Sequence, residues 1–121
     1  NFIGGDRVDD ARDYLQGAGL YCEIVDKSEI TESLKLMCLA KYGMSIAFSK
    51  YQLEICEKYG FAYLNVIKWD ENYNKFVGDS LQRPIIFPPA KSINGHCVIP
   101  NTKVLNQQHP NPILEEVLKY E

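Results

Sequence analysis

A single long run of helical periodicity constrains this chain more than any other feature of its sequence. Between Ser28 and Tyr59, large apolar side chains recur at steps of three and four residues and form one helical stripe, namely Ile30, Leu34, Met37, Met44, Phe48, Tyr51 and Ile55. Ser28 is a favourable N-cap, and Gly60 follows the pattern as a stop signal. The sequence therefore predicts one helix of about 30 residues, which would be about 45 Å long.

A second face of the same predicted helix is also apolar. Its members are Leu36, Leu39, Gly43, Ile46, Ala47 and Leu53. We expect a helix with two apolar faces to lie at the centre of a bundle or in a dimer. A glycine in a helix interior costs about 1 kcal/mol relative to alanine, so we also expect a close backbone crossing at Gly43.

Shorter elements are predicted on both sides of the long helix. Before it, residues 2–5 and 20–25 have the pattern of strands, and a helix over residues 7–16, capped by Asp6, connects them. After it, we expect a helix over residues 63–77 and an irregular, proline-containing stretch over residues 78–97. Further helical segments are expected over residues 102–106 and, capped by Asn111, up to Tyr120.

These elements predict a mainly α fold of the α+β type. Residues 1–27 form a short β-α-β remnant, and residues 28–121 form a long central helix with a helical bundle around it. The length of 121 residues, with 45% hydrophobic and 24% charged residues, is that of one ordinary globular domain. Because the chain opens without a methionine on an apolar run into glycines, we expect it to be a fragment of a longer protein.

Charge and hydropathy exclude several classes of function. The net charge is −3, and the 13 lysines and arginines are scattered, so we expect no nucleic-acid partner. No apolar stretch approaches the roughly 20 residues of a membrane span, and no secretory signal pattern opens the chain. We therefore expect a cytoplasmic protein without a membrane partner.

The four cysteines do not form a recognisable metal or disulfide framework. They are widely spaced, and no CxxC pair occurs among Cys22, Cys38, Cys56 and Cys97. We expect Cys38 and Cys56 to be buried in the packed faces of the long helix, and Cys22 to belong to a strand. Cys97 differs, because it follows a glycine turn at the end of the proline-containing stretch.

A thiol such as Cys97 becomes a good nucleophile only near positive charge. Lys35, in the first turns of the long helix, or the adjacent His96 could supply that charge. The helix dipole mildly disfavours a lysine near a helix N-terminus, which hints at another purpose for Lys35. Taken alone, Lys35 is more typical of a solvated surface lysine, and Cys97 is more typical of an unreactive thiol.

The order of these features resembles the UDP-glucose/GDP-mannose dehydrogenase family. The long helix of that family begins Glu-x-x-Lys-Leu and later carries Ile-Ala-Phe, which match residues 32–36 and 46–48 here. Residues 89–97 lie in register with the family's glycine-rich loop, which ends in the catalytic cysteine. The resemblance implies the end of an NAD-binding domain followed by a central helical domain, like the 6-phosphogluconate dehydrogenase C-terminal-like helical domain.

The resemblance also implies a chemistry and a set of site residues. NAD-dependent oxidation of a sugar alcohol carbon would use Cys97 as the nucleophile and Lys35 to stabilise developing negative charge. The nucleotide-sugar substrate would be contacted by Phe87, Ser92, Asn94, Gly95 and His96. A homodimer through the long helix is implied as well.

The chain departs from the family pattern at several positions. Leu39 replaces an asparagine of the family's long helix, Asn101 replaces an aspartate, and three loop glycines are replaced by Ala90, Ser92 and Asn94. The chain has no G-x-G-x-x-G fingerprint, so we expect no cofactor on this chain alone and no activity in isolation. Two alternatives stay open: a non-catalytic dimerisation or ligand-binding module derived from the family, and a helical bundle with chance similarity.

Overall fold

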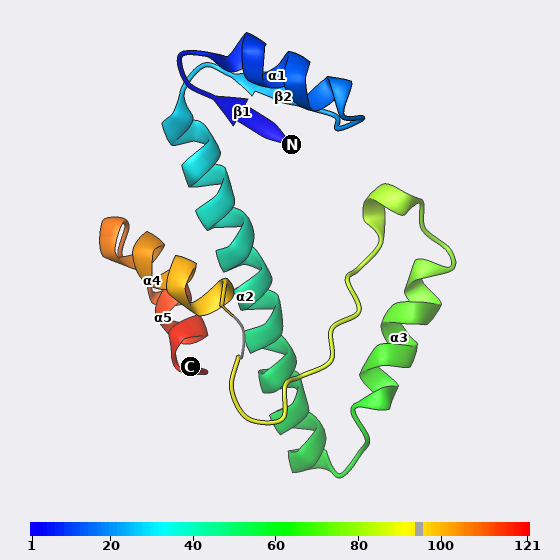
Figure 1. The fold of residues 1–121 in the computed structure, drawn as a ribbon. Coiled ribbons are helices and arrows are strands. Elements are labelled where there is room, and N and C mark those ends of the chain that lie inside the picture. The colour runs from blue at the N-terminus through cyan, green and yellow to red at the C-terminus, as the bar shows by residue number, and fades with distance from the viewer. Residues whose placement is uncertain (94–95) are drawn as a thin grey trace. The chain divides into compact units, whose positions relative to one another are not determined.

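The computed structural model describes residues 1–93 and 96–121, and over them the chain is mainly helical with one two-stranded parallel sheet (Figure 1). This agrees with the predicted fold class. The chain divides into two compact units, a first unit Asn1–Cys38 and a second unit Leu39–Glu121. The division falls inside the long helix, so that its first residues belong to the first unit.

The first unit contains a parallel β-α-β segment. β1 (Phe2–Gly4) pairs with β2 (Glu23–Val25), and α1 (Val8–Gly17) connects the two strands. β2 is shorter than predicted, because the Leu20 N–H donates to the Leu15 carbonyl and thereby helps to close the end of α1. The predicted Asp6 cap is wrong: Arg7 occupies the N-cap position, without a capping side chain, and its guanidinium pairs with Asp10.

The long helix α2 (Ser28–Tyr59) is continuous over 32 residues, as its periodicity predicts. Gly60 ends it with a φ of +73°, a left-handed conformation that favours glycine. The Phe61 N–H then donates to the Cys56 carbonyl at 3.0 Å, which satisfies an acceptor of the last turn.

The rest of the second unit consists of α3 (Leu64–Asn74), a short 3-10 turn η1 (Asp79–Leu81), an extended segment, α4 (Val98–Gln108) and α5 (Pro112–Leu118). The last helix is capped as predicted, because the Asn111 side chain accepts from the Ile113 N–H at 2.9 Å. The helix expected over residues 102–106 begins four residues earlier. Pro100 is compatible with this start because N–H groups of the first turn have no intrahelical acceptor.

The core of the second unit lies where α4 and α5 pack against the middle of α2 (Figure 1). A Cβ atom at Gly43 would lie 2.7 Å from Val98 Cγ1 and 2.8 Å from Val117 Cγ1. Other elements therefore approach α2 closely at Gly43, but side chains of two helices make the approach, and not the backbone crossing that the sequence predicts. The buried hydrophobic cluster at this crossing consists of Ala47, Ile93, Val98, Ile99 and Val117.

The two cysteines of α2 differ in their surroundings. Cys56 is buried as predicted, with 1% of its surface exposed. The expectation for Cys38 is wrong, because this residue is exposed. The reason is that Cys38 lies on the side of α2 opposite Gly43 and Ala47, where α4 and α5 pack.

We predict that Gly43→Ala lowers the free energy of unfolding of the second unit by about 1–3 kcal/mol, despite the better helix propensity of alanine. The added methyl group would collide with Val98 and Val117, whose β-branched side chains have little rotamer freedom. Chemical denaturation measures the change. The matched control is Gly78→Ala, where nothing lies within 4 Å of the added atom and φ is −67°; equal effects at both positions would contradict the prediction.

Candidate functional site

The two predicted catalytic residues belong to different units. Lys35 is exposed on α2 in the first unit, and Cys97 is exposed directly before α4 in the second unit. Their pairing stays a prediction. Of the predicted substrate contacts, His96 is exposed and Ser92 is half-buried, whereas Asn94 and Gly95 lie outside the described residues.

Cys97 occupies the N-cap position of α4, and a buried residue follows it. Val98 is 7% exposed and contacts the α2 helix at Gly43. The first turn of α4 is therefore packed against α2, while the Cys97 thiol stays at the surface. The positive end of a helix dipole stabilises negative charge that develops beside it. The Cys97 carbonyl accepts from both the backbone N–H and the side-chain Nδ2 of Asn101, at 3.2 and 2.7 Å. An aspartate at position 101 could not donate the second of these bonds.

Residues 82–93, which follow η1, are held by side chains of neighbouring elements. Prolines at 84, 88 and 89 have no N–H group, which limits the backbone hydrogen bonds that this segment can donate. Lys50 Nζ donates to the Pro89 carbonyl at 2.9 Å, and the Tyr63 hydroxyl donates to the Ile86 carbonyl at 3.0 Å. Residues 82–93 of the predicted irregular stretch therefore form an anchored segment.

Both ends of this segment are anchored as well. At its beginning, Arg83 and Asn74 form two hydrogen bonds of 2.8 Å, one from the Asn74 amide to the Arg83 carbonyl and one from the Arg83 N–H to Asn74 Oδ1. At its end, the Ile93 N–H donates to the Tyr120 carbonyl at 2.6 Å. Residues 82–93 are thus fixed to α2, α3 and the residues after α5.

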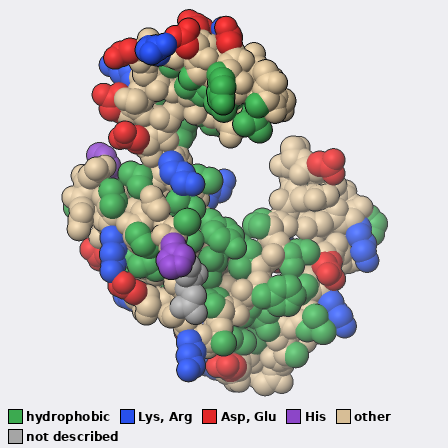
Figure 2. All heavy atoms as spheres, viewed as in Figure 1, with side chains coloured by type: hydrophobic (Ala, Val, Ile, Leu, Met, Phe, Trp, Pro, Cys, Tyr) green, Lys and Arg blue, Asp and Glu red, His purple; other side chains and the backbone are tan. Residues whose placement is uncertain are grey.

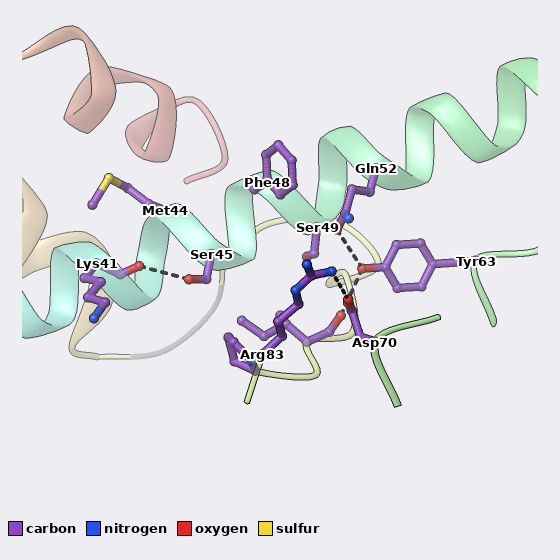
Figure 3. Close-up of a pocket in the computed structure, with 11 residues that line it drawn as sticks. Lys41, Met44, Ser45, Phe48, Ser49, Gln52, Tyr63, Asp70 and Arg83 are labelled. Atoms are coloured by element: carbon purple, nitrogen blue, oxygen red, sulfur yellow. Dashed lines mark hydrogen bonds and ion pairs between the residues drawn. The ribbon is translucent and has the colours of Figure 1, made fainter. Parts of the chain in front are cut away.

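A hollow of about 540 Å³ opens between α2, α3 and the anchored segment. Figure 3 shows that the side chains of Tyr63, Asp70 and Arg83 point toward one another, next to Ser49 and Gln52 of α2. Arg83 Nη1 lies 3.5 Å from Asp70 Oδ1, and the guanidinium carbon lies 3.9 Å from the centre of the Tyr73 ring. The hollow thus has a polar centre with both a cation and a carboxylate.

Burial raises the pKa of Tyr63 above the ordinary value of tyrosine, and the negative charge of Asp70 raises it further. The Tyr63 hydroxyl therefore keeps its proton at neutral pH and acts there as a hydrogen-bond donor. It lies 3.3 Å from Gln52 Oε1 and 3.0 Å from the Ile86 carbonyl.

A second hollow, of about 320 Å³, lies between α2 and the anchored segment and includes Phe87 in its lining. Phe87 is 66% exposed, and Tyr42, Ile46 and Ile93 contribute further apolar surface. Phe87 therefore belongs to the anchored segment and borders this second hollow. Its role as a substrate contact stays a prediction.

No sequence pattern singles out Lys50, Tyr63, Asp70 or Arg83. These residues come from α2, from the start and middle of α3, and from the anchored segment, and only the turn after Gly60 brings them together. No motif or short spacing connects them. The only sequence signal was the cluster of prolines, whose carbonyl groups need donors from elsewhere in the chain.

Comparison with protein-family models, curated proteins and solved structures finds no match to this chain. Over residues 1–93 and 96–121, no three His, Cys, Asp or Glu side chains gather in a way that could hold a metal ion. None of the helices that the structure describes combines the length and the apolar character that crossing a bilayer requires.

We predict that Tyr63→Phe lowers the free energy of unfolding by about 0.5–1.5 kcal/mol at neutral pH, because it removes a donor and leaves the Ile86 carbonyl without one. The folded state raises the pKa of Tyr63 above 10.0, so its contribution to stability is complete below that pH and is lost as the pH rises above it. Urea denaturation on both sides of pH 10 should therefore show a steeper loss for the wild type than for the variant. Parallel pH profiles would contradict this prediction.

Proposed function

We propose that this chain is the central, dimerising and substrate-contacting portion of a divergent NAD-dependent nucleotide-sugar dehydrogenase. The observation that carries the proposal is the position of Cys97, an exposed thiol at the N-terminus of α4. It follows a segment that side chains of the long helix and of α3 hold in place. A parallel β-α-β segment before the long helix adds support, because the same order underlies the resemblance.

In this proposal the chain supplies the nucleophile and the substrate-side contacts. Cys97 holds the oxidised sugar carbon as a covalent adduct, and Lys35 stabilises the negative charge that develops on the substrate oxygen. Phe87, Ser92 and His96 contact the nucleotide-sugar. NAD accepts the hydride in a complete protein, and its binding is not assigned to this chain, which has no G-x-G-x-x-G fingerprint.

The proposed dimer uses the apolar stripe of α2. Phe48 and Tyr51 of this stripe are 59% and 53% exposed. They line one side of an apolar groove of about 400 Å³, and Ile113 of α5 and Tyr120 also line it. Hydrophobic side chains also gather on the surface of the second unit in the view of Figure 2. Exposed apolar surface of this kind marks an interaction site.

A second candidate is a non-catalytic dimerisation or ligand-binding module derived from the same family. Leu39 is half-buried and offers no hydrogen bond at a position where the family has an asparagine, and the Asn101 amide is engaged within its own helix. These two observations favour loss of catalysis while the long helix is retained. For either candidate we propose a cytoplasmic location, since all four cysteines of the chain are free thiols.

For the dimer, we predict that sedimentation equilibrium gives a mass of twice 13.8 kDa for the wild type. Phe48→Asp should weaken the dimer by about tenfold or more, because it places a charge in an apolar interface. Trp69→Asp is the matched control, since Trp69 is a 73% exposed aromatic residue of α3 outside the stripe. A monomeric wild type, or equal weakening by both variants, would contradict the proposed dimer.

For the nucleophile, we predict that iodoacetamide alkylates Cys97 faster than Cys38, as measured by peptide mass spectrometry. Both thiols are exposed, but Cys38 lies inside a helix, whereas Cys97 lies at a helix N-terminus. The buried Cys22 and Cys56 should react only after unfolding. If Cys97 reacts no faster than Cys38, the catalytic assignment fails and the non-catalytic candidate is preferred.

A further inference from the structure

Two side chains of the α2–α3 region bind backbone carbonyls in the middle of the segment that leads to Cys97. Lys50 Nζ donates to the Pro89 carbonyl at 2.9 Å, from the α2 side. The Tyr63 hydroxyl donates to the Ile86 carbonyl at 3.0 Å, from the N-cap of α3. The two bonds hold positions three residues apart on the segment.

The environment of Lys50 is unusual for a lysine whose only role is solubility. Its side chain is half-buried, and no carboxylate lies within ion-pair distance of it in the described part of the chain. Burial of an ammonium group costs free energy unless hydrogen bonds compensate, and here a neutral carbonyl is the acceptor. The hydrogen bond from Lys50 to the Pro89 carbonyl therefore restrains the anchored segment. A lysine side chain that extended into solvent would not restrain it.

The segment depends on such bonds because of its composition. Pro88 and Pro89 have no N–H group, so this stretch cannot pair with a neighbouring strand in the usual way. Beyond Pro89, the Ile93 N–H donates to the Tyr120 carbonyl, four residues before Cys97.

We infer that Lys50 and Tyr63 are positioning residues: they fix the anchored segment on α2 and α3 and thereby set the direction from which substrate meets Cys97. This inference rests on the proposed function. Neither side chain is assigned a contact with the reacting atoms.

The test uses Lys50→Met and Tyr63→Phe, which keep the size of each side chain and remove its donor. Lys50→Arg should restore the bond to Pro89. The matched control is Lys41→Met, a lysine of α2 whose side chain makes no hydrogen bond or ion pair among the described residues.

The first readout is hydrogen exchange at the amides of Arg83 and Ile93, which donate to Asn74 Oδ1 and to the Tyr120 carbonyl on either side of the two contacts. Loss of a hydrogen bond from a charged donor should accelerate local opening, and hence exchange, by about tenfold in Lys50→Met, with a smaller effect in Tyr63→Phe. Lys50→Arg and Lys41→Met should exchange at the wild-type rate. Wild-type exchange in both Lys50→Met and Tyr63→Phe would overturn the inference.

The second readout is the ratio of the alkylation rates of Cys97 and Cys38 in each variant. A role in positioning predicts that Lys50→Met changes this ratio and that Lys50→Arg restores it. A faster-exchanging segment with an unchanged ratio would mean that Lys50 only stabilises the fold, and the inference would fail. A Cys97-to-Cys38 alkylation ratio near one in the wild-type protein would mean that the proposed function fails. Hydrogen exchange does not depend on thiol chemistry, so that failure is distinguishable from failure of this inference.

Discussion

The missing side chain at Gly43 is the constraint on which the second unit depends. It lets Val98 of α4 and Val117 of α5 reach the middle of α2 at distances that any other residue would prevent. The cost of a glycine in a helix interior, about 1 kcal/mol, is offset by burial of two valines at the crossing. The hydrophobic cluster around Ala47 and Ile99 is built on this contact.

The same contact accounts for the position of the thiol. Val98 is buried against α2, and the residue immediately before it in the chain is Cys97. A buried first residue of α4 therefore fixes the N-terminus of that helix on α2, while the N-cap residue stays exposed. The anchored segment precedes this point in the chain and is held by Lys50 and Tyr63, which lie on α2 and at the start of α3. One helix thus supports the core, the segment and the thiol.

The elements with strong local signals could be predicted from the sequence. The 32-residue α2 follows from the periodicity of its apolar residues, the start of α5 follows from Asn111 and Pro112, and the close approach follows from Gly43. Elements that depend on distant partners could not be predicted. The early start of α4 depends on packing of Val98 against α2, which no local pattern encodes.

The candidate site could be predicted only in part, for the same reason. Cys97 and Phe87 were chosen from a resemblance in the segment itself, whereas Lys50 and Tyr63 act on it from elements more than 20 residues away in the sequence. Such hydrogen bonds to backbone carbonyls leave no pattern in the residues that accept them. Cys38 shows the opposite error, since an apolar helical face predicts burial even where no neighbouring element covers it.

The most direct test of this account is a nuclear Overhauser measurement on the chain with methyl-labelled valines. The account predicts cross-peaks from the γ-methyl groups of both Val98 and Val117 to the α-protons of Gly43, because all three residues meet at one crossing. Absence of both cross-peaks in the folded chain would contradict it. In that case α2 would not be the support that fixes α4, and the explanation for the exposed position of Cys97 would be lost with it.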